Sequence, residues 1–506
     1  MMMQRMIHVA FVSLSAVSLC ALSAVAVAAD ETAVTIYSSA SPGAISPDMY
    51  RPVPGGGMPP AGSVPGYALV KQERGIRLDA GRTQLRFTDV AALIDPTTVT
   101  FTSLTDPATR VLEQNFQFDL VSTDKLLQKY VDRPVSIERQ GGATVSGTLL
   151  SSVDGLVVRG ADGGITAVRD YAALKFPELP GGLITRPTLL WDLAASKAGD
   201  QRARVTYQTA GITWWADYNL IYSAGSSANS GFLDLAAWVS IINQSGANFT
   251  DARLKLVAGD VHRAPAAPSQ RVMLAMADGA RAKDGGFNEK AFDEFHLYTL
   301  GRATTLPNNS TKQLELFDQA RHVPAQREFV FAGSPEGFFA AAPLTDRAMG
   351  IRTGAKVDSF LIFRNDKAAG LGVPLPAGRI RVSRLDAADG SLEFIGEDVI
   401  GHTPRDETVR VKLGSAFDIV GERRQVSFNL DTKARWMEEE IEVELRNHKP
   451  EAVEVQVRES LFRWAGWTIS GNSLPYRKLD ASTVVFPVKV AADGHAALRY
   501  KVRYSW

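Results

Sequence analysis

One pattern dominates the chain from residue 200 to its end, where short runs alternate apolar and polar residues. The runs include RARVTYQT, FLDLAAWVSIINQS, QVSFNL, VEVQVRES and ALRYKVRY, with polar turns between them. Many short strands at this spacing are typical of a β-sandwich, because alternation turns one strand face to a core and the other to water. Long helical segments are nearly absent. We therefore predict a mainly β fold with a large antiparallel β-sandwich region over residues 200–506, interrupted by a mobile excursion at 263–290, which is rich in Pro, Ala and Gly.

The chain before residue 122 shows the same alternation with one interruption. Residues 39–66 contain so many Pro and Gly that neither a helix nor a central strand can persist, which predicts an extended surface loop. Alternating runs lie on both sides of the polar turn at residues 79–81, and this arrangement predicts a hairpin. Residues 30–121 are thus expected to form an N-terminal β domain that includes the Pro/Gly-rich loop 39–66.

Residues 122–178 have a pattern of their own. The run TDKLLQKY predicts a short helix with Thr123 as the N-cap candidate, and four or five short strands joined by Gly turns follow, with a bend at Gly147. This order resembles an Sm-like or SH3-like small barrel, which we expect to be inserted into the N-terminal β domain. Such barrels bind RNA in other proteins, but this segment is not basic, so no RNA binding is expected here.

The first 29 residues have the pattern of a secretory signal peptide. Arg5 precedes an apolar run over residues 7–27 that ends in small residues, and a polar DET sequence follows Ala29. The alternative is a retained membrane anchor, because the run is near the length that spans a bilayer. We expect export to the periplasm or the exterior, with peripheral association at the outer membrane as a further option. No later apolar run approaches the roughly 20 residues of a transmembrane helix, so none is expected in the mature chain.

Composition excludes several classes of protein. The 506 residues include 55 basic and 55 acidic side chains, 45% hydrophobic residues and one cysteine, Cys20. The chain is too apolar for a disordered protein, too poor in Cys for a disulfide scaffold and too balanced in charge for a nucleic-acid partner. Because Cys20 lies in the expected signal peptide, the mature chain is cysteine-free, which excludes cysteine nucleophiles and thiolate zinc sites.

Four separate motifs in a consistent order carry a family resemblance. They are GITWWADYNLIY at 211–222, WVSIINQSGANFTDARLKLVAGD at 238–260, a long stretch beginning LGVPLPAGRIRVSRL at 371–423, and IEVELRNHKPEAVEVQVRE at 441–459. Together they are similar to the family called domain of unknown function 4139 (DUF4139), which includes mucoidy inhibitor-like proteins. The resemblance implies an envelope-associated or secreted β-rich protein with no established activity. Those relatives carry a coiled coil where this chain has the small barrel.

The densest aromatic cluster supplies the candidate binding residues, which are Trp214, Trp215, Asp217 and Tyr218. Flat apolar rings suit the C–H face of a pyranose, and a nearby carboxylate accepts hydrogen bonds from hydroxyl groups. The alternative follows from strand alternation, which puts Trp214 and Trp215 on opposite faces, one in the core and one against a neighbouring sheet. Trp464 and Trp467 allow the same two interpretations.

No motif points to catalysis or to a metal. None of the seven His lies within four residues of another, and the usual ligand spacings are missing, so we expect no metal site, no cofactor and no catalytic residue. His402 and His448 lie in turns, where a surface hydrogen bond is the ordinary role. The three residues Glu438, Glu439 and Glu440 precede an alternating strand and predict a solvated edge or face.

These observations favour an exported envelope protein that is a non-catalytic binding or scaffolding module, with an envelope protein or a polysaccharide as its partner. The first alternative is a glycan-acting enzyme or glycan-binding protein that uses Trp214, Trp215 and Asp217. The second alternative is an outer-membrane-associated β protein, because residues 498–506 alternate up to a terminal aromatic, as the last strand of an outer-membrane barrel does.

Overall fold

The computed structural model describes residues 30–37, 45–46, 49–50, 64–259, 287–292, 295–334, 341–348, 356–386 and 388–506. The expected signal peptide 1–29, most of the loop 39–66 and residues 263–286 of the expected excursion lie outside the described residues. Strands dominate the described parts, which confirms the prediction of a mainly β fold. No helix among the described residues is long and apolar enough to cross a membrane.

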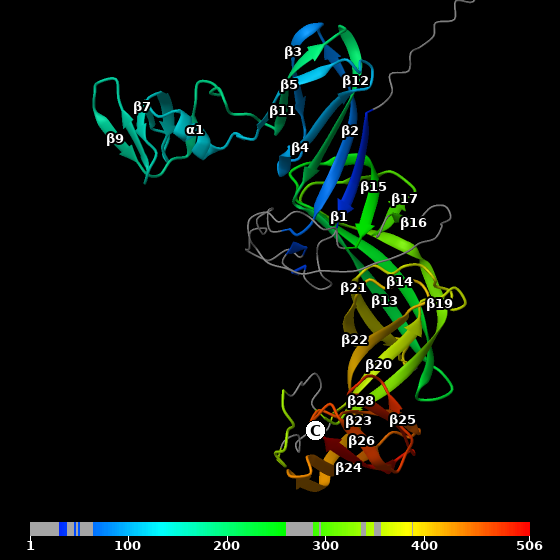
Figure 1. Cartoon of the computed structure of the whole chain (residues 1–506). Helices are drawn as coiled ribbons and strands as arrows, with labels where there is room; N and C mark the ends of the chain where they lie inside the picture. The colour runs from blue at the N-terminus through cyan, green and yellow to red at the C-terminus, as the bar shows by residue number, and fades with distance from the viewer. Residues whose placement is uncertain are drawn as a thin grey trace, which may run out of the picture.

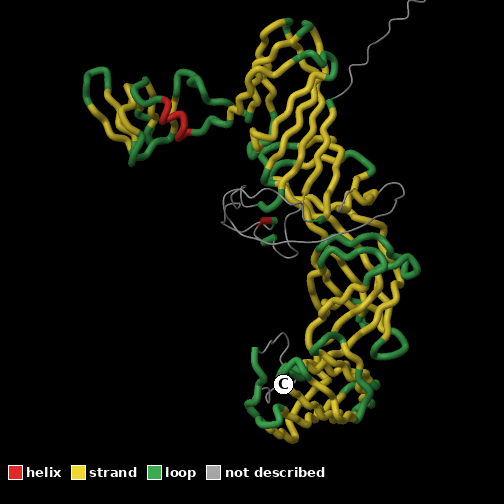
Figure 2. The backbone as a smooth tube through the Cα atoms, in the orientation of Figure 1, coloured by secondary structure: helices red, strands yellow, loops and turns green. Residues whose placement is uncertain are grey.

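The molecule is elongated, and a small insert projects from one side (Figures 1 and 2). At the opposite end from the C-terminus lies a unit made of two sheets, which we call the N-terminal unit. Its larger sheet has the order β16 (Phe287–Phe292), β17 (Phe295–Leu300), β15 (Phe249–Ala258), β1 (Glu31–Tyr37), β2 (Tyr67–Leu78), β12 (Gly199–Thr209) and β4 (Ile94–Ser103), with β18 (Thr304–Leu306) beside β15. Its smaller sheet has the order β3 (Gly81–Thr88), β11 (Thr188–Ala195) and β5 (Arg110–Gln117).

This unit corrects two predictions. The turn at residues 79–81 does not close a hairpin, because β2 pairs with β1 and β12 while β3 pairs with β11 in the other sheet. A polar turn looks the same in sequence whether the chain folds back on itself or crosses between two packed sheets. The sequence analysis also begins the β-sandwich region at residue 200, but the sheets do not divide there. β12 and β15, which belong to that expected region, lie in the same sheet as β1 and β2.

The insert lies between β5 and β11 and begins with the helix α1 (Thr123–Lys129). Ser122 caps this helix by accepting a hydrogen bond from the Lys125 amide, so the cap falls one residue before Thr123. Five strands follow in the order β10 (Ala173–Lys175), β6 (Pro134–Glu138), β7 (Thr144–Ser151), β8 (Leu156–Arg159) and β9 (Ile165–Val168). Gly147 lies in close contact with β8, because a Cβ atom there would come 2.2 Å from the Arg159 carbonyl oxygen. The expected sequence of a helix and short strands is confirmed.

One long sheet forms the rest of the molecule. Its order is β22 (Leu392–Ile400), β21 (Gly378–Leu385), β13 (Ile212–Ala224), β14 (Ser230–Asn243), β19 (Ser310–Ala332), β20 (Lys356–Arg364), β23 (Thr408–Asp431), β24 (Trp436–Asn447), β29 (Gly494–Ser505) and β26 (Trp467–Asn472). A branch adds β25 (Val453–Ser460), β28 (Thr483–Val490) and β27 (Arg477–Lys478). The region is not purely antiparallel, since β21 runs parallel to β13 and β25 runs parallel to β19.

Two very long strands connect a middle unit to a C-terminal unit within this sheet. β19 has 23 residues and β23 has 24, and each contributes its first part to one core and its last part to the next. The first core is shared by the N-terminal and middle units, the second belongs to the C-terminal unit, and the insert has a small core of its own. The sheet curls in the middle unit, where the Lys412 amide of β23 donates to the Asp398 carboxylate of β22 at 2.7 Å.

Candidate functional site

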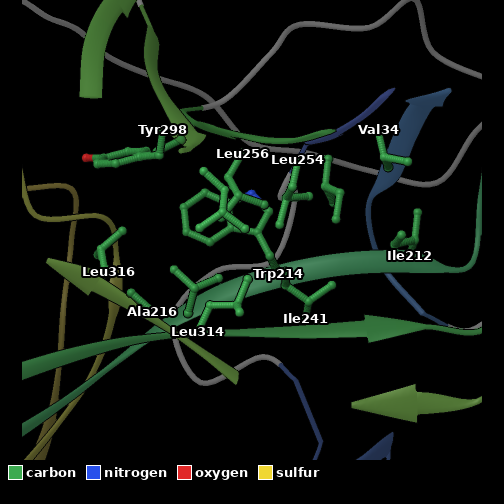
Figure 3. Packing of buried hydrophobic residues seen from close by; sticks show 14 of the residues in the cluster. Val34, Ile212, Trp214, Ala216, Ile241, Leu254, Leu256, Tyr298, Leu314 and Leu316 are labelled. Atoms are coloured by element: carbon green, nitrogen blue, oxygen red, sulfur yellow. The ribbon is translucent and has the colours of Figure 1, made fainter. Parts of the chain in front are cut away.

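Strand alternation separates the four candidate residues, all of which lie on β13. Trp214 points into the shared core and is 1% exposed. Its indole N–H donates to the Val257 carbonyl at 3.3 Å, and its ring meets Tyr298 edge-on at 6.3 Å between centroids. Figure 3 shows this ring among apolar side chains of β15 and β19. Trp214 therefore cannot present its face to a ligand, and its assignment as a binding residue is wrong.

Tyr218 lies on the same inward face and is also buried. Its hydroxyl donates to the Pro376 carbonyl at 2.7 Å, and burial raises the pKa of the phenol well above its usual value. The side chain closes the core beneath the start of β21 and does not reach the surface. Like Trp214, it is a packing residue, because residues two and four positions apart on a strand share one face.

Trp215 lies on the outward face and is partly covered. Its ring packs against Tyr50 with centroids 5.5 Å apart and planes tilted by 42°. Ile45, Val64 and Ile242 form the small apolar cluster beneath these two rings. The described pieces of the segment between β1 and β2 thus pack on Trp215 and cover part of its ring.

Asp217 is the outward carboxylate of the cluster and is 8% exposed. Ser240 on β14 donates to Oδ2 at 2.8 Å, and Nη1 of Arg381 on β21 lies 3.4 Å from Oδ1. The Ser240 hydroxyl in turn accepts from Gln313 on β19 at 3.1 Å, and Arg381 pairs with Glu397 on β22 at 2.9 Å. A connected row of polar groups therefore crosses five adjacent strands and holds the carboxylate in one position.

Trp238 is the residue that the sequence analysis missed. It is in register with Asp217 on one side and with Glu315 of β19 on the other, and it is 37% exposed. Directly opposed residues in a ladder share a face, so its ring stands between two carboxylate positions on the outward surface. The alternation of Trp238, Ser240 and Ile242 in WVSII could have assigned all three to one face. Only the pairing of β13 with β14 brings that face to Asp217.

We call the surface built from these residues the outer aromatic face. Arg379 belongs to it because it is in register with Asp217 on β21 and lies 3.7 Å from Glu397. The outer aromatic face consists of Trp215, Asp217, Trp238, Glu315, Arg379, Arg381 and Glu397. It combines one exposed indole with three carboxylates and two guanidinium groups, which can accept and donate hydrogen bonds side by side.

The other candidate side chains do not join this face. Nδ1 of His402 accepts a hydrogen bond from the Ala377 amide at 3.0 Å, and the His448 backbone amide donates to the Asp418 carbonyl oxygen in the C-terminal unit. Trp467 donates to the Ala481 carbonyl and lies under the Lys478 ammonium, and Trp464 packs beside the C-terminal core. Hydrogen bonds and local packing account for the side chains of His402, Trp464 and Trp467.

The C-terminal unit holds buried charge that the sequence analysis placed on a solvated face. Glu439 is buried on β24 and pairs with Arg463 at 2.9 Å, and Arg463 also donates to two carbonyls of the segment 341–348. Glu459 is fully buried, accepts from Tyr500 at 2.6 Å and pairs with Arg423 at 2.9 Å. Burial raises the pKa of the Glu459 carboxyl. Each carboxylate has a guanidinium partner, so removal of one member of either pair would leave a buried charge uncompensated.

No group of three or more His, Cys, Asp or Glu side chains that could hold a metal ion lies in the described part of the chain. No protein-family model, no curated protein and no solved structure matches the chain.

Proposed function

We propose that this chain is an exported envelope protein of the domain of unknown function 4139 family and acts as a non-catalytic binding module. The secretory pattern of residues 1–29 supports export, and the four motifs between residues 211 and 459 support the family. The partner is an envelope component, either a polysaccharide or another envelope protein.

The outer aromatic face carries the binding proposal. Asp217 is already held by Ser240 and Arg381, and so it serves as a fixed hydrogen-bond acceptor. Trp238 offers exposed aromatic surface in the same row. Exposed aromatic side chains beside fixed polar groups favour recognition, because they bury apolar area while the polar groups orient the ligand.

Export is tested by expressing the full chain with its own leader and measuring the mass of the protein recovered outside the cytoplasm. The expected mass lacks about 29 N-terminal residues. Recovery of the intact chain in the cytoplasm alone would contradict the proposal.

Binding is tested by co-sedimentation of the purified protein with washed cell envelopes. Trp238→Ala should weaken the association at least tenfold, because it removes the exposed ring. The matched control is Phe417→Ala, since Phe417 is an aromatic residue on β23 that is 95% exposed and does not belong to the outer aromatic face. Equal association of both variants and the unaltered protein would sink the proposed role of this face.

A further inference from the structure

We propose that the outer aromatic face binds an uncharged polysaccharide, with one sugar ring stacked on Trp238. This inference rests on the proposed binding function and assigns the chemical class of the ligand. It differs from the sequence prediction in its central residue, because Trp238 takes the place that the motif gave to Trp214.

The arrangement of groups around Trp238 matches a pyranose. The indole provides a flat apolar surface for the C–H face of the ring, while Asp217 and Glu315 are in register on either side. Neighbouring strands lie about 4.8 Å apart, so the backbone positions of the two acidic residues lie about 10 Å apart with that of Trp238 between them. That span places acceptors for hydroxyl groups at both edges of a sugar ring stacked on the indole.

The charges of the face favour a neutral ligand. Asp217 pairs with Arg381, and Glu397 pairs with Arg381 and lies near Arg379. With Glu315, the face has three carboxylates against two guanidinium groups, so its net charge is −1. Such a mixture of both signs creates little net field, whereas a polyanion or a polycation is recognised by a surface of one sign. The same groups keep their capacity to donate to and accept from hydroxyl groups, because a carboxylate oxygen can accept more than one hydrogen bond and a guanidinium group has five N–H donors.

The face is also fixed before a ligand arrives. Asp217 is held by Ser240, and Ser240 is held by Gln313, on strands that are paired along their length. On one side of Trp238, Trp215 and Tyr50 pack together next to the open surface. Groups that are already ordered lose little conformational entropy on binding, so a few hydrogen bonds and one stacked ring suffice for measurable affinity.

The test is affinity electrophoresis of the purified full chain in native gels that contain dextran, galactomannan, hydroxyethyl cellulose or, separately, polyuronic acid. We expect retardation by at least one of the three neutral polymers, with little change between 50 and 500 mM salt in a parallel binding titration of that polymer. Trp238→Ala should reduce the affinity at least tenfold. Trp238→Tyr should retain most of it, because a flat ring remains, and Phe417→Ala should leave it unchanged.

Three outcomes would overturn the inference: retardation by polyuronic acid alone, retardation by none of the four polymers, or equal losses in Trp238→Tyr and Trp238→Ala. Envelope co-sedimentation separates these outcomes from failure of the binding function itself. Suppose that association with envelopes depends on Trp238 while no polysaccharide is bound. The proposed binding function would then stand, and the partner would be an envelope protein. Circular dichroism of each variant shows that a loss of binding does not come from unfolding.

Discussion

Replacing Trp214 by alanine should destabilise the junction between the N-terminal and middle units far more than the same replacement at Trp238. The Trp214 side chain is buried and its indole N–H bonds to Val257. Burying about 200 Å² of aromatic surface contributes ~5 kcal/mol at ~25 cal/mol per Å². Truncations of buried aromatic residues to alanine cost about 3–5 kcal/mol, which agrees with that figure. Trp238 stands on the surface, where truncation leaves no enclosed cavity, so we expect a cost of about 1–2 kcal/mol.

The assay is urea unfolding followed by far-UV circular dichroism, with amide hydrogen exchange to locate the change. A loss of about 4 kcal/mol lowers the midpoint of the affected transition by ~1 M for a urea m-value of about 3–4 kcal/mol/M. Exchange protection in β13 and β15 should fall in Trp214→Ala and stay near that of the unaltered protein in Trp238→Ala. Equal midpoints for the two variants, or a larger loss for Trp238→Ala, would refute the assignment of the two faces of the sheet.

Three further predictions concern pH, buried charge and close packing. Hydrogen bonds from Ser196 and Thr109 lower the pKa of Asp106 to about 2. The stability gained from this carboxylate is therefore complete above pH ~4 and lost as the pH falls toward 2, so the urea midpoints of the unaltered protein and Asp106→Asn should converge between pH 5 and pH 2.5. Glu459→Gln removes the carboxylate charge that pairs with the buried guanidinium of Arg423 and should cost about 3–5 kcal/mol, measured by urea unfolding of the C-terminal unit. Replacing Arg423 by Met in the same chain should restore part of this loss. Gly378→Ala would place a Cβ atom 2.3 Å from the Ala216 carbonyl oxygen, and the resulting strain of about 1–3 kcal/mol should lower the melting temperature and also weaken ligand binding at the neighbouring Arg379.

The sequence was informative wherever the structure depends on local periodicity. Alternation located the strands of the long sheet, and the TDKLLQKY run located the helix α1. Both signals come from residues within a few positions of one another, because the side-chain period of a strand or a helix is a local property. Alternation also predicted that Trp214 and Trp215 lie on opposite faces of their strand, as they do in the structure.

Pairing between strands was not accessible in the same way. The register that sets Asp217 beside Trp238 joins residues 21 positions apart, and the parallel pairing with Arg379 joins residues much farther apart. Many registers satisfy the same alternation, since a shift by two residues preserves the face of every side chain. The interaction of Glu439 with Arg463 was missed for the same reason, although the shared parity of Glu439 and Ile441 on β24 places that carboxylate inward.

Alternation along β13 gives one short motif two structural roles. The inward residues Trp214 and Tyr218 attach this strand to β15 and to the segment before β21 through hydrogen bonds to the carbonyls of Val257 and Pro376. The outward residue Asp217 lies between these two positions, so the same packing that fixes the core also fixes the carboxylate on the opposite face. A rigid strand keeps the outer aromatic face ordered, so we expect Trp214 and Tyr218 to affect the proposed binding without contacting the ligand. The aromatic density of the motif therefore reflects its position where two units share a core, while Trp238 from the neighbouring strand completes the outer aromatic face, which is the surface proposed for recognition.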